Sequence, residues 1–256
     1  MVFDRALVKI WKGVFVLKIV QVSVQELPEE QKSFLLDLMM RGEKKSAVPV
    51  YYRNEVGEVF FVADCVLRDV KAFEKAAPKG LYRGGALLKL LTKYGQVVLY
   101  DERYRWLRLI GGIARFDEGD NLTKTAIREA VVEELAVLAE NETVRLVPEG
   151  SKNLVGLSIP GWGITVQDIL EAGSLSVVDY FFNDANRAFE VVVEWNLIDW
   201  NELSILHSED WFKGGRSGFT PFVINECADI VGVFDGRHGY VSLPVVHLHP
   251  TLESCL

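Results

Sequence analysis

Glu129 and Glu133 are two glutamates spaced one helical turn apart. In this sequence they are the residues whose type and spacing best suit metal binding and catalysis. On a helix, side chains four positions apart lie within about 40° of each other on one face. Two carboxylates placed in this way can share a hard divalent cation, because Mg²⁺ prefers oxygen ligands and keeps positions for waters and phosphate oxygens. Taken alone, such a pair is more often a solvated helix surface, since glutamate is mostly exposed.

The residues around Glu129 and Glu133 favour a metal site over a solvated helix surface. Gly111 and Gly112 precede an acidic loop, and the loop leads into a helical pattern over residues 119–138. Apolar residues fall opposite Glu129 on the helical wheel and predict the face that packs on the core. These residues are Ile127, Val131, Leu135 and Leu138.

The stretch "GGIARFDEGDNLTKTAIREAVVEELAV" contains two glycines, an acidic loop and a predicted helix, and predicted strands lie on both sides of it. Upstream, "GQVVLYDERYRWLRLIGG" predicts a strand pair with Trp106 shortly before two glycines, and downstream "EVVVEWNLIDWNEL" predicts a strand and a short helical turn. Together these segments, over about residues 85–206, resemble the Nudix hydrolase family. The family signature is a glycine, a glutamate six positions later, and R-E-U-x-E-E-x-G-U on a helix, where U is a bulky apolar residue.

The sequence can be aligned with this signature in two registers. With Arg128-Glu129 as the R-E pair, Asp120 stands in the glutamate position of the loop and Glu133 matches the second paired glutamate. Val132 then replaces the first paired glutamate, and Leu135 replaces the glycine. The other register aligns Glu133-Glu134 with the paired glutamates but puts Ala130 at the catalytic position, so the first register preserves more.

A one-residue bulge in the helix would bring Glu129, Glu133 and Glu134 onto one side, and such bulges occur at functional sites.

The resemblance implies a magnesium or manganese site that acts on a diphosphate. Glu129 and Glu133 would be both the catalytic residues and metal ligands, and Glu134 would add a further ligand. Arg128 would brace the loop through an ion pair with Asp120 or Glu118, and Gly111 and Gly112 would shape the backbone that leads into it.

Residues outside the signature supply three more candidates. Glu190 and Glu194 alternate with Phe189, Val191, Val193 and Trp195 along a predicted strand, so the glutamates share one face. Glu190 is therefore a candidate metal ligand, although a polar face of this kind more often meets solvent. Trp162, in a Pro-Gly turn, could stack on a base, and Arg216, in "GGRSG", could contact an anion. His247 and His249 form an H-x-H pair without an evident third zinc ligand.

Three hypotheses follow. The first is a Nudix-type, metal-dependent hydrolase of a nucleoside diphosphate-linked substrate. The second is a Nudix-like domain that has lost turnover and serves as a nucleotide-binding or protein-interaction module, which would explain Val132 and Leu135. The third is an unrelated α+β protein with a chance match.

Composition limits the partners. The net charge of −8 and the pI near 5.2 argue against binding to long nucleic acids, which depends on clustered Lys and Arg. No apolar run approaches the roughly 20 residues of a membrane helix, and no signal sequence is evident. Three cysteines without a C-x-x-C pair are typical of reduced thiols. We therefore expect a cytoplasmic protein that binds neither long nucleic acids nor membranes. The small nucleotide-type ligand is what the resemblance to the Nudix family implies.

The elements that must position the site form an α+β fold. We expect a Nudix-like mixed or antiparallel sheet sandwiched by helices over residues 83–256, and a small α/β extension over residues 1–82. The patterns predict strands within 7–24, a helix over 27–43, hairpins over 48–64 and 178–200, and a helix over 220–234. Residues 1–82 could form a lid, a homodimer surface or a separate domain.

Overall fold

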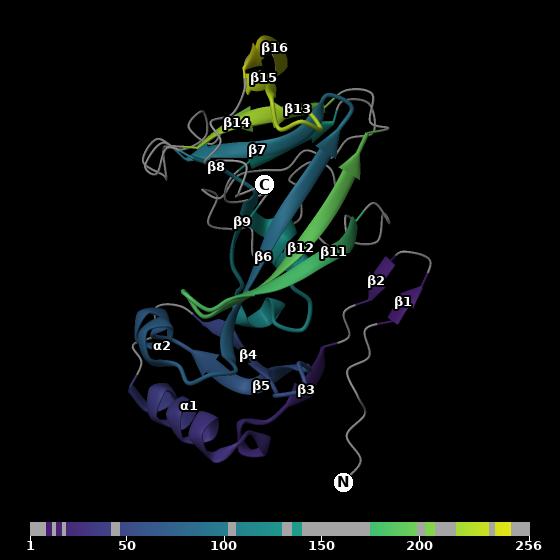
Figure 1. The fold of residues 1–256 in the computed structure, drawn as a ribbon. Coiled ribbons are helices and arrows are strands. Elements are labelled where there is room, and N and C mark those ends of the chain that lie inside the picture. The colour runs from purple at the N-terminus through teal and green to yellow at the C-terminus, as the bar shows by residue number, and fades with distance from the viewer. Residues whose placement is uncertain are drawn as a thin grey trace. The chain divides into compact units, whose positions relative to one another are not determined.

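The fold contains many strands and few helices. The computed structural model describes residues 9–11, 14–16, 19–41, 47–101, 106–129, 135–139, 175–198, 203–207, 219–235 and 239–246 (Figure 1). Parallel and antiparallel strand pairs both occur. The predicted α+β class with a mixed sheet is confirmed at this coarse level, and the Nudix-like arrangement stays a prediction.

The chain forms two compact units. One comprises Met1–Ala86, Gly112–Thr125 and Val177–Val193, and the other comprises Leu87–Gly111, Ala126–Ser176 and Glu194–Leu256. Five of the described elements continue from one unit into the other. They are strands β6 (Leu81–Thr92), β9 (Ile110–Ile113), β11 (Leu175–Asn183) and β12 (Ala188–Leu197) and helix α3 (Thr123–Arg128). The division predicted between residues 82 and 83 falls inside β6 and stays a prediction.

The sheet of the first unit is built on short-range hairpins. Strand β4 (Val48–Arg53) pairs antiparallel with β5 (Val59–Leu67) and with the start of β6, while β3 (Val20–Val22) lies parallel to β5. Asn54 shapes the β4–β5 turn, because its side-chain oxygen accepts hydrogen bonds from the Val56 and Glu58 N–H groups. The hairpin predicted at this turn is confirmed. Strands β1 (Lys9–Trp11) and β2 (Val14–Val16) form a separate antiparallel pair.

Two helices pack on one side of this sheet (Figure 1). The helix predicted over 27–43 is confirmed, since α1 (Glu29–Arg41) begins directly after Pro28 with Glu29 and Glu30 in its first turn. Ser23 caps the short helix η1 (Val24–Glu26), and Asp69 caps α2 (Val70–Ala76). Within the described residues, no helix is long and apolar enough to span a bilayer.

The helix side of the sheet holds the main apolar core of this unit. Its buried residues come from α1, α2 and the strands, and include Leu35, Leu38, Val50, Val62, Cys65, Phe73 and Leu81. Burial, and then the charge of Asp64, raises the pKa of the Cys65 thiol to about 12. Cys65 is therefore a buried thiol that stays protonated near neutral pH.

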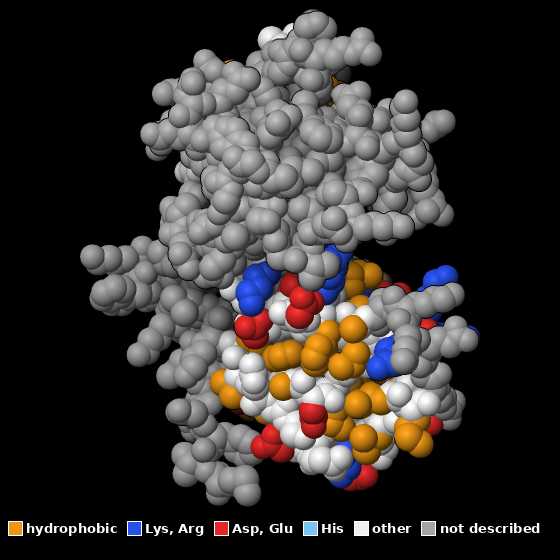
Figure 2. Space-filling model, turned by 180° about the vertical axis from the view of Figure 1, so that it is seen from behind, with side chains coloured by type: hydrophobic (Ala, Val, Ile, Leu, Met, Phe, Trp, Pro, Cys, Tyr) orange, Lys and Arg blue, Asp and Glu red, His pale blue; other side chains and the backbone are white. Residues whose placement is uncertain are grey.

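Aromatic side chains cover the opposite face. Val50 and Val62 belong to the core on the helix side of the sheet. Tyr51 comes directly after Val50 and Phe61 directly before Val62, and successive side chains of a strand alternate between its two faces, so Tyr51 and Phe61 point away from the helices. The Tyr51 ring lies 5.6 Å from that of Phe61 and 5.0 Å from that of Phe189, measured between centroids. Phe189 belongs to the hairpin of β11 (Leu175–Asn183) and β12, which confirms the hairpin predicted over 178–200. In the view from behind, hydrophobic side chains gather on the described surface beside charged ones (Figure 2).

The second unit consists mainly of antiparallel strands. The end of β6 pairs with β7 (Gly95–Asp101), which also pairs with β8 (Trp106–Arg108) and β14 (Phe219–Ile224). Strands β15 (Ile230–Asp235) and β16 (Gly239–Val246) continue this order. Strand β10 (Leu135–Ala139) pairs with β13 (Leu203–His207) in a separate sheet. The remaining strand, β9 (Ile110–Ile113), pairs with β6.

The helix predicted over 220–234 is wrong. This segment forms the β14–β15 hairpin, in which Val223 lies opposite Gly232. The turn is made by Asn225, whose side-chain oxygen accepts hydrogen bonds from the Cys227 and Asp229 N–H groups. The Thr-Pro signal for a helix start is overridden, because β7 offers a complete partner strand to β14.

Candidate functional site

The two predicted glycines lie on β9, the strand that leads into the acidic loop. The Arg108 guanidinium donates to the carbonyl oxygens of Leu109 and Gly111, each at 3.2 Å. In the first unit, a Cβ atom added at Gly85 would lie 3.1 Å from the Gly112 carbonyl oxygen. The role predicted for Gly111 and Gly112, which is to shape the backbone that leads into the loop, stays a prediction.

The loop after β9 is fastened to the sheet by backbone hydrogen bonds. The Ala114 N–H donates to the Gly84 carbonyl at 3.0 Å, and the Phe116 N–H donates to the Ala47 carbonyl at 2.8 Å. The short helix η2 (Phe116–Glu118) follows and ends at Gly119. The loop therefore has a defined path before the helix begins.

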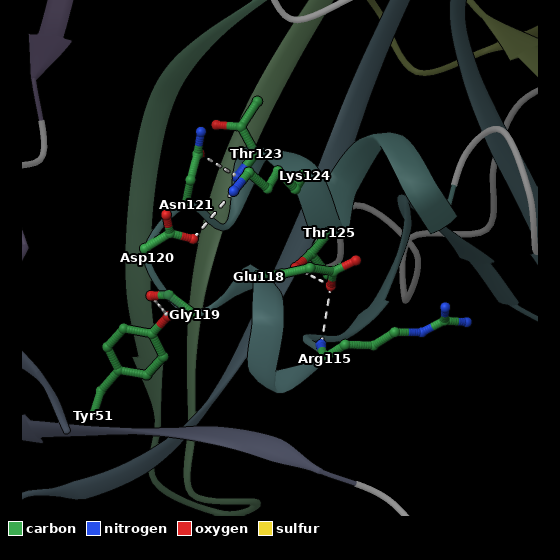
Figure 3. Close-up of polar contacts among 9 residues, drawn as sticks. All are labelled: Tyr51, Arg115, Glu118, Gly119, Asp120, Asn121, Thr123, Lys124 and Thr125. Atoms are coloured by element: carbon green, nitrogen blue, oxygen red, sulfur yellow. Dashed lines mark hydrogen bonds and ion pairs between the residues drawn. The ribbon is translucent and has the colours of Figure 1, made fainter. Parts of the chain in front are cut away.

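Glu118 organises this loop from within. Its carboxylate oxygen Oε2 accepts from the Arg115 N–H at 2.9 Å and from the Thr125 hydroxyl at 2.8 Å (Figure 3). Glu118 is 7% exposed and Thr125 is fully buried. These two bonds join the start of η2 to α3, so Glu118 is part of the framework that holds the loop.

Tyr51 anchors the far side of the loop. Its hydroxyl donates to the Gly119 carbonyl at 2.6 Å (Figure 3). Burial, and then the charges of Asp120 and Glu118, raises the pKa of the Tyr51 phenol, so the group stays protonated as a donor. A Cβ atom at Gly119 would lie 2.5 Å from the Phe61 ring, which explains why a residue without a side chain stands there.

Asp120, predicted to be part of the loop framework, is exposed and pairs with Lys124. The Lys124 Nζ atom lies 3.3 Å from Asp120 Oδ1, one turn along the chain (Figure 3). An exposed pair of this kind contributes little to stability. Asn121 accepts a hydrogen bond from the Thr123 N–H at 3.1 Å and so shapes the turn into α3.

The end of α3 carries a buried ion pair. Arg128 Nη1 lies 2.8 Å from Glu129 Oε1, and each residue is 4% exposed. The interpretation of Glu129 as a solvated helix surface is therefore wrong. A buried carboxylate needs a compensating charge, and Arg128 supplies one.

The backbone at Glu129 is π-helical, directly after the last α-helical residue, Arg128. A π-helical turn widens the helix and changes the direction in which the following side chains point. The proposed bulge would act at this point of the chain. Its effect on Glu133 and Glu134 stays a prediction, because both residues lie outside the described part of the chain.

The helix predicted to continue to residue 138 is shorter. Leu135–Ala139 is strand β10, in which Leu135 lies opposite His207 and Val137 lies opposite Ile205. Leu135 and Leu138 therefore do not belong to the core face of a helix. A five-residue apolar run has no clear period, and the distant strand β13 decides its conformation.

Glu190 lies on β12 as predicted, with its neighbours on the strand facing the other way. Phe189, Val191, Val193 and Trp195 are all buried, which confirms the alternation. Burial raises the pKa of Glu190, and the attraction of Arg83 opposes this shift. Within the described residues, Glu190 has no hydrogen bond or ion pair, whereas Glu194 pairs with Lys89 at 3.2 Å.

Arg83 is a charged residue near Glu190 that the sequence patterns do not identify. Arg83 Nε lies 2.7 Å from Glu74 Oε1, and Arg83 Nη1 is buried without a hydrogen-bond partner among the described residues. An arginine inside the apolar strand sequence "LYRGGALL" was the signal that could have identified this cluster. Arg83, which is buried, and Glu190, which is half-buried, thus form a second place where charged groups lie close together.

The remaining predicted residues cannot be placed against these two clusters. Glu133, Glu134, Trp162 and Arg216, together with His247 and His249, lie outside the described residues. Among the residues that are described, no group of three or more His, Cys, Asp or Glu side chains could hold a metal ion. The carboxylate oxygens of Glu129 are ligands of the kind that Mg²⁺ prefers. The other proposed ligands from the helix lie outside the described residues, and the magnesium or manganese site therefore stays a prediction.

In comparisons with known proteins, no family model, curated protein or solved structure matched this chain.

Proposed function

We propose that this chain is a Nudix-type hydrolase that cleaves the diphosphate of a small nucleoside diphosphate-linked compound with magnesium or manganese. The placement of Glu129 is the observation that carries this proposal. Its carboxylate is buried, is paired with Arg128, and stands at a π-helical turn after a loop whose path is fixed by Glu118 and Tyr51. A buried carboxylate on a rigid support suits catalysis better than a surface role.

Each residue has a chemical role in this proposal. Glu129 and Glu133 bind the cation, and Glu129 also accepts the proton of the attacking water. Arg128 holds the Glu129 carboxylate in place through their ion pair. The cation, when bound, neutralises charge on the phosphoryl oxygens and lowers the pKa of bound water. Glu134 and Glu190 are additional metal ligands in this proposal, and Trp162 and Arg216 contact the substrate.

A second candidate function is binding of a nucleotide or a protein without turnover. It is favoured by strand β10, which begins at Leu135, the position of the glycine in the family signature. In addition, Arg128 already compensates the charge of Glu129, so the carboxylate is stable without a cation. This candidate predicts saturable nucleotide binding with no release of monophosphate.

Three variants of the whole chain distinguish these functions. Monophosphate release is measured with magnesium on a panel that contains ADP-ribose, a dinucleoside polyphosphate and a nucleoside triphosphate. Glu129→Gln and Glu133→Gln should each lower the rate at least about 100-fold, because each removes a metal ligand. The matched control is Glu226→Gln, an exposed glutamate in the β14–β15 turn, which should keep the native rate.

Equal rates for the native chain and Glu133→Gln would contradict the hydrolase proposal. Loss of the ion pair in Glu129→Gln could also unfold its surroundings, so thermal melting of each variant is recorded beside the rate. If no compound is cleaved, equilibrium binding of the same panel tests the second candidate, and absence of binding would contradict that candidate as well.

A further inference from the structure

The first unit contains a cavity away from the residues considered so far. Its volume is about 740 Å³, within the range of roughly 300–1,000 Å³ that is usual for small-molecule sites. The start of α1, the end of β4 with its turn, and the connection from α2 to β6 supply its walls. The lining residues used below are Glu30, Gln31, Tyr52, Arg53, Glu55, Lys79 and Gly80.

Hydrogen bonds hold these three segments together. The Arg53 N–H donates to the Gly80 carbonyl at 2.7 Å, and Gln31 Nε2 donates to the Lys79 carbonyl at 3.0 Å. Gly80 has a φ of +91°, and a Cβ atom there would lie 2.7 Å from the Arg53 carbonyl oxygen. A glycine is therefore required at this position, and its lack of a side chain leaves the wall of the cavity open.

Arg53 is positioned by an aromatic ring instead of a carboxylate. Its guanidinium carbon lies 4.4 Å from the centroid of the Phe182 ring. In the part of the chain that the structure describes, neither Arg53 nor Lys79 has an ion-pair partner, and both side chains are exposed. The Arg53 guanidinium thus contacts an aromatic ring and has no carboxylate partner among the described residues, and planar donors of this kind suit an oxyanion.

The other side chains of the cavity define the rest of the ligand. Glu30 and Glu55 bring two carboxylates that balance the charges of Arg53 and Lys79. Tyr52 is half-buried, and burial, followed by the charge of Glu55, raises the pKa of its phenol. The carboxylates accept hydrogen bonds from hydroxyl groups and repel a second phosphate, so the lining favours one oxyanion on a hydroxylated body.

We infer that this cavity binds a phosphomonoester of a small hydroxylated molecule, a sugar phosphate in chemical terms. Arg53 and Lys79 bind the phosphate, Glu30 and Glu55 accept from the hydroxyl groups, and the Tyr52 ring packs against the body of the ligand. This inference does not depend on the proposed hydrolase activity, because none of these residues belongs to the site around Glu129.

Calorimetric titration of the whole chain tests the inference with three probes: ribose 5-phosphate, ribose and inorganic phosphate. Ribose 5-phosphate should bind at least about tenfold more tightly than either fragment, since only it contacts both ends of the cavity. Arg53→Gln should weaken its binding about tenfold or more, because a charge-assisted hydrogen bond is lost. Glu55→Gln should weaken ribose 5-phosphate and leave phosphate unchanged.

Arg68→Gln is the matched control, because Arg68 is an exposed arginine of the same unit that does not line the cavity. It should change the dissociation constant by less than about twofold. Equal weakening by Arg53→Gln and Arg68→Gln would overturn the inference, as would native affinity in Arg53→Gln. Absence of saturable binding to the native chain would also overturn it, and thermal melting verifies that each variant is folded.

Discussion

Glu118 and Glu190 are glutamates of the same compact unit whose carboxylates have very different surroundings. Glu118 accepts hydrogen bonds from a backbone N–H and from the Thr125 hydroxyl, and it joins η2 to α3. Glu190 has no hydrogen bond or ion pair among the described residues, although burial raises its pKa.

The comparison teaches that burial alone does not identify a functional carboxylate. A buried acid whose oxygens are bonded within the fold stabilises that fold. An acid that is half-buried and has no hydrogen-bond partner makes the fold less stable, and its oxygens stay available to a ligand. By this criterion Glu190, with Arg83 near it, is the better candidate for a ligand contact, and Glu118 is a structural residue.

The largest effect is expected for Glu118→Ala. The substitution removes two hydrogen bonds to a charged acceptor and leaves the buried Thr125 hydroxyl without that partner. The free energy of unfolding should fall by about 2–4 kcal/mol. Urea denaturation followed by circular dichroism measures this change. Asp117→Ala, at an exposed neighbouring position, should change it by less than about 0.5 kcal/mol, and equal effects of the two substitutions would contradict the structural role of Glu118.

The sequence predicted the parts of this region that depend on neighbours in the chain. Helix α1 follows Pro28, and the turns at Asn54 and at residues 183–187 are local signals, so these elements were predicted correctly. Strands β10 and β14 were assigned to helices, because their partners β13 and β7 lie far away in the sequence. An apolar run cannot report a partner of that kind.

The same limit applies to the candidate site. The Arg128–Glu129 pair is adjacent in the sequence, so both residues were selected from the signature alone. The bond from Tyr51 to Gly119 joins residues 68 positions apart, and nothing near either residue predicts it. Glu118 was recognised only as a loop acid, because the burial that makes it structural arises from the packing of the whole unit.

An intermediate effect is expected for Gly119→Ala, with Gly85→Ala as its matched counterpart. Gly119 has an ordinary helical φ of −64°, so alanine meets only steric resistance there. Its Cβ would lie 2.5 and 2.6 Å from atoms of the Phe61 ring and 2.8 Å from the Pro49 Cβ. These neighbours are rigid and packed, so the free energy of unfolding should fall by about 1–3 kcal/mol.

At Gly85 the added Cβ would meet the Glu190 side chain at 3.2 and 3.4 Å and the Gly112 carbonyl oxygen at 3.1 Å. A glutamate without hydrogen-bond partners can change its rotamer, so the loss should be less than about 1 kcal/mol. Thermal melting of both variants gives the order. A larger loss for Gly85→Ala than for Gly119→Ala would show that the Glu190 side chain is held as firmly as the loop around Glu118.

The smallest effect, and one of opposite sign, is expected for Glu190→Gln. Because burial raises the pKa of Glu190 in the folded chain, the folded state binds more protons than the unfolded state at pH values above about 4.5. Its stability therefore decreases as the pH rises through the raised pKa, and the ionised carboxylate is unfavourable at pH 8. Glutamine carries no charge, so the variant should melt at a temperature up to about 4 °C higher at pH 8.

This gain should shrink as the pH falls towards 4.5, because the native carboxyl group then becomes protonated and neutral like glutamine. Melting curves of both proteins between pH 4.5 and pH 8 measure the difference. Glu194→Gln is the control, because it removes the ion pair with Lys89 and should give no such gain. A variant less stable than the native chain at pH 8 would mean that Arg83 outweighs burial, and Glu190 would then belong with Glu118 among the structural carboxylates.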